Sequence, residues 1–311
     1  MSLHALTLTS YDRAELKRAF SQQFAQMKLI DAMHARGPRV LLKPNFVMAS
    51  APDDPSTTHP DFYMSVAMVL LEAGFQVGIG ESPAFGSCRA ALAAHGVLEE
   101  CHALGIEVVE FHQTTPYEGI GDHPRYARLT IARELEEWHS LINLPKLKTH
   151  KQFVFTAATK NLYGCVVGKR KFIRHNLCRN DPVLFARMVI ANAEQANAIV
   201  HIADGIAAAH VNGPRGGQPY PLHRVLFSDS PLALDWAFAR MTRLDPASTP
   251  LFQAVSKHVE LEAAYASICA HCPPVDDFMH APLIHISFAP WAVARSCVRT
   301  VRHNLGLSVG A

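Results

Sequence analysis

Acidic residues are absent from one long part of this sequence. No Asp or Glu occurs between Glu137 and Asp181, although the chain of 311 residues carries 27 acidic and 29 basic side chains. The same part is rich in hydrogen-bond donors, namely Lys146, Lys148, His150, Lys151, Lys160, Asn161, Lys169, Arg170, Lys171, Arg174 and His175. Cationic donors repel one another unless an anion lies among them. We therefore predict an anion-binding region within residues 143–175.

Features that define several other protein classes are also missing. No uninterrupted apolar run approaches the roughly 18 residues that suggest a membrane span. The N-terminal segment lacks the long apolar core and cleavage site of a signal peptide. Seven scattered cysteines are an odd number, which favours reduced thiols over a disulfide framework. A net charge of +2 is too small for a surface covered in nucleic-acid contacts. We expect a cytoplasmic protein with no membrane partner.

Two kinds of apolar segment alternate along the chain. Short continuous runs, typical of buried strands, occur at residues 40–42, 76–79, 106–111, 140–144, 198–202 and 225–227. Helices are predicted at residues 12–33, 58–74, 89–95, 182–195 and 232–241. This alternation predicts an α/β fold with a mostly parallel, doubly wound sheet and helices on both faces. We expect an α/β domain over residues 1–241 and a mainly helical C-terminal extension over residues 242–311, packed on it, with one strand at 283–288.

Polar side chains stand at or just after the ends of the predicted strands. They are Lys43, Asn45, Glu81, Lys146, Lys148, His150, Asp204 and Asp229. Ligands of doubly wound sheets bind beyond the carboxyl ends of the strands, so one cleft would gather these side chains. The alternative is that loops between strands and helices are polar in any protein.

The pair Lys146 and Lys148 is the strongest part of this pattern. In extended backbone, residues two apart point to the same face, so the two lysines present paired charges to a phosphate or carboxylate. The amides of Asn45 and Asn161 could orient such a group. The alternative is a solvated basic edge strand, because lysines protect exposed edges from pairing. In either case we expect replacement of these lysines by alanine to leave the fold intact.

The candidate residues divide by the chemistry that they support. The predicted catalytic groups are His150, Lys148 and Asp204, with His150 as the general acid or base and Asp204 as a base or metal ligand. Cys165 is a candidate thiolate, because cations surround it in the sequence. As groups that bind the ligand or a cofactor we predict Lys43, Asn45, Lys146, Lys160, Asn161, Lys171 and His175. Glu81 and Asp204 are also candidate ligands of a divalent metal, and helix capping is their alternative role. Most of the 18 histidines must be structural.

A set of short motifs occurs in the order expected of one known family. They are Lys43-Pro44-Asn45, Thr58-His59-Pro60, Glu72-Ala73-Gly74, Gly80-Glu81-Ser82, residues 143–150, residues 160–164, Asp204-Gly205-Ile206, Gly213-Pro214 and residues 229–235. With these motifs, which lie between residues 40 and 235, the chain resembles the DUF362 family. The resemblance implies no particular reaction. It does imply a link to redox chemistry, since some members carry an iron-sulfur ferredoxin module.

The chain departs from those members near its C-terminus. A cluster module needs four thiolates at close spacing, whereas here only Cys269 and Cys272 form a pair, so we expect no built-in iron-sulfur cluster. These two cysteines could form half of a metal site completed by a nearby histidine. The alternative is that they are two small thiols without a ligand.

Two classes of function follow from these observations. The first is an enzyme, related to redox or cofactor chemistry, that binds a small anionic ligand at the strand ends and works as a homo-oligomer or with a separate redox partner. The second is an RNA-binding or accessory module. In it, the basic residues of 143–175 contact phosphates and Phe153, Phe155, Tyr163 and Phe172 stack on bases.

Overall fold

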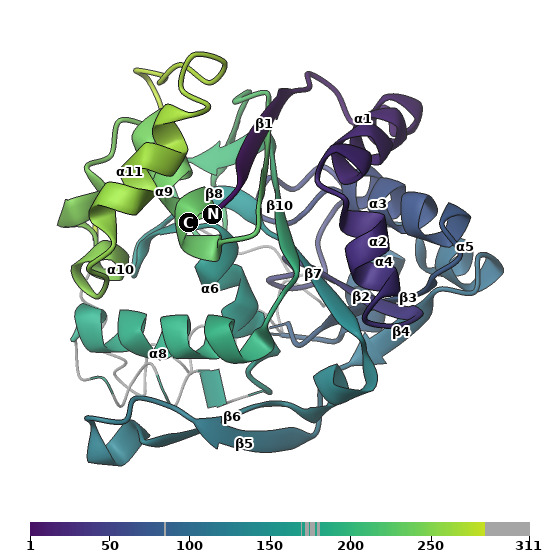
Figure 1. Ribbon diagram of the computed structural model, residues 1–311, viewed down its shortest axis with the longest axis horizontal. Helices are drawn as coiled ribbons and strands as arrows, with labels where there is room; N and C mark the ends of the chain where they lie inside the picture. Colours follow the sequence, from purple (N-terminus) through teal and green to yellow (C-terminus); the bar gives the residue numbers. More distant parts are fainter. Residues whose placement is uncertain (84, 169, 172–173, 175–177, 179–180, 284–311) are drawn as a thin grey trace, which may run out of the picture.

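A mixed sheet forms the centre of the computed structural model, which describes residues 1–283 except 84, 169, 172–173, 175–177 and 179–180 (Figure 1). Its strands are β1 (Leu3–Thr7), β2 (Arg39–Pro44), β3 (Gln76–Glu81), β4 (Glu107–Glu110), β7 (Ser140–Leu144), β8 (Lys146–His150), β9 (Val154–Thr156), β10 (Val200–His210), β11 (Gln218–Tyr220) and β12 (Arg224–Ser228), and β5 (Thr114–Glu118) and β6 (Arg128–Ala132) form a separate hairpin. The α-helices are α1 (Arg13–Gln26), α2 (Leu29–His34), α3 (Pro60–Glu72), α4 (Cys88–Ala94), α5 (Leu98–Ala103), α6 (Ala158–Leu162), α8 (Pro182–Ala196), α9 (Pro231–Met241), α10 (Pro250–Gln253) and α11 (His258–Ala266). Short 3-10 helices are η1 (Pro124–Tyr126), η2 (Arg133–Glu137), η3 (Tyr163–Cys165) and η4 (Pro246–Ser248).

The middle of the sheet is parallel. The strands follow the order β1-β12-β10-β7-β2-β3-β4, with β8 and β11 paired to β10, and β9 paired to β8. Strands β10, β7, β2, β3 and β4 run parallel to one another, whereas at one edge β12 pairs antiparallel with β10, and β1 pairs antiparallel with β12. The α/β class with a largely parallel sheet is therefore confirmed.

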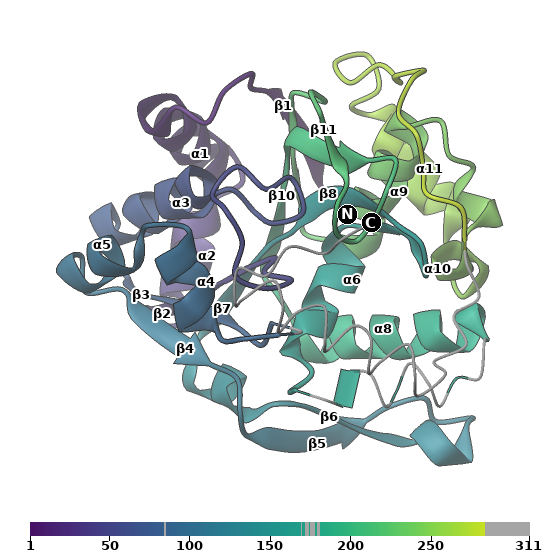
Figure 2. The same cartoon turned by 180° about the vertical axis from the view of Figure 1, so that it is seen from behind.

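Helices cover both faces of the sheet. Helices α1 to α5 lie on one side, and α6 and α8 to α11 lie on the other together with the β5–β6 hairpin (Figures 1 and 2). Successive residues of a strand point to opposite faces. Val40 and Leu42 accordingly pack in the core beneath α1 and α3, while Leu41 packs in the core of the opposite face. Two apolar cores thus hold the central strands rigidly from either side.

Two predicted elements differ from the structure at their boundaries. The helix predicted over residues 12–33 is two helices, because Lys28 adopts a left-handed conformation with φ of 53° and α2 begins after it. The strand predicted at 198–202 is only the start of β10, which continues to His210. Its first residues pair with β7 and its later ones with β8, β11 and β12. Asp204 therefore lies within a strand and does not cap a helix.

One strand end points away from the others. Strand β12 is antiparallel to β10, and Ser228 at its carboxyl end lies opposite His201 near the start of β10. Asp229 follows that end and accepts a hydrogen bond from the backbone N–H of Ser2 at 2.8 Å. Asp229 therefore does not join the predicted cluster of strand-end side chains.

The described part of the C-terminal region packs on the sheet domain. Leu251, Phe252 and Leu261 belong to the same apolar core as Trp236 of α9. The backbone N–H of Ala281 donates a hydrogen bond to Thr149 Oγ1. Except for Leu283, which is not in a strand, the strand predicted at 283–288 lies outside the described residues.

Candidate anion-binding site

Five of the predicted site residues come together where β2, β3 and β7 end and β8 begins, beside the middle of β10. Lys43, Glu81, Lys146, Lys148 and Asp204 are all buried, and their exposed fractions are 2% or less. They come from β2, β3, β8 and β10. Burial of charged side chains costs free energy unless each is paired or hydrogen-bonded, so their partners decide what the site can do.

Lys43 and Glu81 form a closed ion pair. Lys43 Nζ donates to Glu81 Oε2 and, at 3.2 Å, to the carbonyl of Pro44. The other carboxylate oxygen of Glu81 accepts the backbone N–H of Ser82 at 2.9 Å. Gly164 lies directly on this pair, because a Cβ built there would overlap both Lys43 Nζ and Glu81 Oε1. The glycine lets the η3 backbone seal the pair from water.

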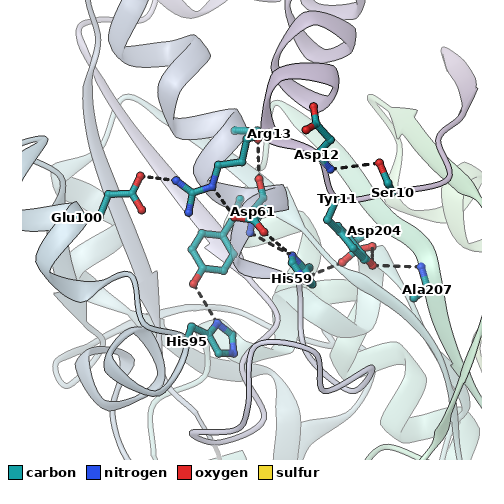
Figure 3. A network of polar contacts seen from close by, with 12 residues as sticks. Ser10, Tyr11, Asp12, Arg13, His59, Asp61, His95, Glu100, Asp204 and Ala207 are labelled. Atoms are coloured by element: carbon teal, nitrogen blue, oxygen red, sulfur yellow. Dashed lines mark hydrogen bonds and ion pairs between the residues drawn. The ribbon is translucent and has the colours of Figure 1, made fainter.

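Lys146 and Asp204 form a second ion pair, with a distance of 2.8 Å between Nζ and Oδ2. Tyr11 OH donates to Asp204 Oδ1 at 2.8 Å and itself accepts from Lys146 Nζ at 2.9 Å and from the backbone N–H of Ala207 at 3.1 Å (Figure 3). The backbone N–H of His59 donates to Asp204 Oδ2 at 3.0 Å. Burial lowers the pKa of Lys146, although Asp204 opposes that shift. Asp204 is thus the fixed counter-ion of Lys146 in this arrangement.

His59 adds an imidazole to this cluster. Its ring stacks on Tyr11 with 3.7 Å between the ring centroids (Figure 3). His59 Nδ1 accepts the backbone N–H of Asp61 at 3.2 Å, which places the ring hydrogen on Nε2. Burial lowers the pKa of His59, so the ring is neutral near pH 7. Its Nε2–H has no hydrogen-bond partner in the described part of the chain, and it can donate to a ligand.

A chain of side-chain amides links the lysines to the middle of the sheet. Lys148 Nζ donates to Asn45 Oδ1, Asn45 Nδ2 donates to Asn161 Oδ1, and Asn161 Nδ2 donates to Asn143 Oδ1, with distances of 2.6, 2.6 and 2.8 Å. Asn143 Nδ2 then lies 2.9 Å from His201 Nδ1. Burial lowers the pKa of His201 to about 3, so its neutral ring accepts this bond. The amides are structural supports of the site.

Lys148 is held by neutral oxygen atoms. Its side chain is 1% exposed, and Nζ donates to Asn45 Oδ1 and to the carbonyl of Ser56. Burial lowers the pKa of Lys148 to about 7, which Asp54 opposes and the charge of Lys160 reinforces. Ser56 Oγ is also buried and has no hydrogen-bond partner among the described residues. The residue that accepts a hydrogen bond from the Lys148 ammonium group therefore also carries a hydroxyl group without a hydrogen-bond partner among the described residues.

Two further lysines of the acid-poor stretch approach this cluster. Lys171 Nζ donates to the carbonyl of Ser82, and burial lowers the pKa of Lys171 to about 8. Lys160 is on α6, and burial together with the charges of Lys171 and Lys43 lowers its pKa to about 7. Mutual repulsion of this kind is relieved when an anion binds.

The alternative of a solvated basic edge strand is wrong. Strand β8 pairs with β10 on one side and β9 on the other, and all five of its residues are buried. Lys146 and Lys148 therefore lie inside the protein, which contradicts the premise that these lysines contribute little to the core, and we now expect their loss to destabilise the fold.

Other predicted residues have different surroundings. His150 is buried and its Nδ1 accepts the backbone N–H of Gln152 at 3.0 Å. Cys165 is buried, and burial raises the pKa of its thiol to about 12, so the expectation of a thiolate is wrong. His175 lies outside the described residues.

The candidate metal ligands do not converge in the described chain. Glu81 and Asp204 each neutralise a lysine, as described above. Cys272 is buried, whereas Cys269 is exposed and lines a surface hollow of about 480 Å³ together with Arg240 and Arg243. Within the described ranges, no three His, Cys, Asp or Glu side chains are grouped as metal ligands.

Three supports of the site were not predicted as site residues. Tyr11 lies far from the basic stretch in sequence, and no pattern marks it. His59 stands in the motif Thr58-His59-Pro60, which could have indicated it. Asp235 of α9 accepts the backbone N–H groups of Ala158 and Thr159 at 2.6 and 3.1 Å, and so caps α6. The folded arrangement shows that Tyr11 contacts Lys146 and that Asp235 holds the start of the helix that carries Lys160.

Comparison with known proteins assigns the sequence of this chain to a family. Residues 40–240 match the family model described as "Domain of unknown function (DUF362)". The chain belongs to the DUF362 family. The matched segment contains the five buried lysines and carboxylates of the site. Tyr11 precedes it, so the candidate site of this DUF362 protein extends beyond the matched segment.

A named relative shares much of the DUF362 chain. The thylakoid-associated protein sll1697 of Synechocystis sp. is 36% identical over 218 residues, which cover 70% of this chain and 67% of the relative. Its name states where that relative is found. In the described part of the present chain, no helix is both long and apolar enough to cross a bilayer.

Proposed function

We propose that this protein binds a small anionic ligand, bearing a phosphate or carboxylate group, beside Lys148 and Lys160. The observation that carries the proposal is a group of buried and partly buried lysines with more positive charges than contacting carboxylates. Lys43 and Lys146 each contact a carboxylate, but Lys148, Lys160 and Lys171 contact none among the described residues. An anion at this place would offset a desolvation cost that the protein alone leaves uncompensated.

Removing the charge of Lys148 should weaken binding of inorganic phosphate. We expect Lys148→Met to raise the Kd about tenfold to 100-fold, because a charge-assisted hydrogen bond contributes roughly 1.5–3 kcal/mol. Isothermal titration calorimetry with phosphate, and with acetate as a carboxylate probe, would measure this on a variant that circular dichroism shows to be folded. Lys151→Met is the matched control, since Lys151 lies just beyond β8 outside the cluster. Equal phosphate affinity in wild type and Lys148→Met would contradict the proposal.

The affinity for the anion should also depend on pH. Because the pKa of Lys148 is lowered to about 7, its ammonium form is present below pH 7 and is lost as pH rises through 7. Titration with sulfate, whose charge stays constant, should give a Kd that is flat well below pH 7 and rises by tenfold to about 100-fold per pH unit above it, because the pKa of Lys160 is also lowered to about 7. The groups that act on Lys148 are Asp54, Lys160, Lys146 and Glu81. A profile that stays flat between pH 6 and 9 would show that buried lysines do not hold the anion.

Base stacking receives no support from the ring positions. Phe153, Phe155 and Tyr163 are buried in the apolar core, with exposed fractions of 4% or less, and Phe172 lies outside the described residues. RNA binding through stacked bases would require these rings to leave the core. The buried lysines favour a small ligand over a polymer.

A further inference from the structure

The five lysines of the site differ in what holds their amino groups. Lys43 and Lys146 donate to carboxylates, Lys148 donates to Asn45 Oδ1 and the Ser56 carbonyl, and Lys171 donates to the Ser82 carbonyl. For Lys160, no hydrogen-bond acceptor lies within reach of Nζ in the part of the chain that the structure describes. Its side chain is also partly exposed, whereas those of Lys43, Lys146 and Lys148 are buried. Lys160 is thus a partly exposed lysine whose amino group meets no hydrogen-bond acceptor among the described residues.

Aromatic rings surround this amine. Lys160 Nζ lies 4.8 Å from the ring centroid of Tyr163, 5.5 Å from that of Phe185 and 6.0 Å from that of Phe153. Desolvation favours the neutral amine, as do the neighbouring charges of Lys171 and Lys43, whereas the attraction of the ring faces for a cation acts in the opposite direction. A desolvated lysine beside another cation is a known arrangement for an amine nucleophile.

The backbone that carries this amine is fixed at several points. Asp235 caps the first residues of α6. Asn161, the next residue after Lys160, donates to Asn143 Oδ1 and to the carbonyl of Lys43. Tyr163 OH donates to the carbonyl of Lys171 at 3.1 Å. A nucleophile needs a fixed position relative to its substrate, and α6 provides one.

We propose that Lys160 forms an imine with the carbonyl carbon of a ligand whose phosphate or carboxylate group is bound beside Lys148. The neutral amine attacks the carbonyl carbon, and a C–N bond forms as the C=O π bond breaks. The resulting carbinolamine loses its oxygen as water, which takes both amine hydrogens and leaves a C=N bond. No electrons are gained or lost, so no oxidant is needed. This inference rests on the proposed anion binding and narrows the ligand to anionic aldehydes and ketones.

Reductive trapping would test the imine. Full-length protein would be incubated with dihydroxyacetone phosphate or pyridoxal phosphate, reduced with sodium borohydride, digested and analysed by peptide mass spectrometry. We expect one of these probes to modify Lys160 at least tenfold more than any other lysine, with excess sulfate suppressing the adduct. Lys160→Arg should abolish it, and Lys151→Met should retain it. Circular dichroism would show that the arginine variant folds, and because arginine keeps the positive charge, loss of the adduct would then report the missing amine.

The outcomes separate the two proposals. If wild-type protein binds phosphate but both probes leave Lys160 unmodified, or modify many lysines equally, the imine is overturned and the anion site stands. If phosphate does not bind and no adduct forms at Lys160, both proposals fail. A sulfate-sensitive adduct at Lys160 supports both.

Discussion

Lys146→Met should lower the free energy of unfolding by about 3–5 kcal/mol, because it leaves Asp204 as a buried carboxylate without its cation. Tyr11 and the backbone N–H of His59 would still donate to Asp204, but neither carries a charge near pH 7. Urea unfolding of wild type and variant, followed by circular dichroism, would measure the difference.

A surface ion pair offers the matched control. Lys17 contacts Glu72 between α1 and α3, and both side chains are partly or fully exposed. Lys17→Met should cost at most about 1 kcal/mol, since exposed pairs contribute little. Adding Asp204→Leu to Lys146→Met should restore much of the lost stability, because both charges are then gone. Equal losses in the two lysine variants would show that the buried charge of Asp204 is not the cause.

Gly164→Ala should lower the free energy of unfolding by about 3 kcal/mol, because the new methyl group must push Lys43 and Glu81 apart. The atoms in its way are the ends of two side chains, which would move easily on a surface. Here both chains are buried and joined to each other, so neither can move without breaking the pair. Urea unfolding followed by circular dichroism would measure the loss.

Gly121 provides the comparison for this substitution. A Cβ at Gly121 would meet no atom within 4 Å, so Gly121→Ala should change stability by no more than about 0.5 kcal/mol. If Gly164→Ala proves as mild as Gly121→Ala, the backbone of η3 does not press on the ion pair and the described packing is incorrect.

The fold class was predictable because local patterns determine it. The apolar runs at residues 40–42 and 140–144 are buried on both sides, as parallel strands require, and they appear as β2 and β7. The antiparallel direction of β12 relative to β10 was not predictable, since an apolar run of residues can form a buried strand in either direction. The break at Lys28 was also hidden, because helical spacing continues through it.

The candidate site was predictable in outline but not in its pairing. Residues at the ends of neighbouring parallel strands must lie together, which explains why Lys43, Glu81 and Lys146 could be grouped from their positions. Which lysine meets which carboxylate depends on side-chain packing, and so does the contribution of Tyr11. The charge state of Cys165 shows the same limit. Nearby cations in sequence suggested a thiolate, but burial outweighs them.

The chain of amides has a consequence for how the site responds to its ligand. Every bond from Lys148 through Asn45, Asn161 and Asn143 to His201 points the same way, with each group donating to the next. No amide in it can rotate alone, because reversing one would set donor against donor on one side and acceptor against acceptor on the other. Any ligand that binds the ammonium group of Lys148 therefore perturbs a polarised series of dipoles that ends at β10. His201, in β10, is where that perturbation would be observed by NMR.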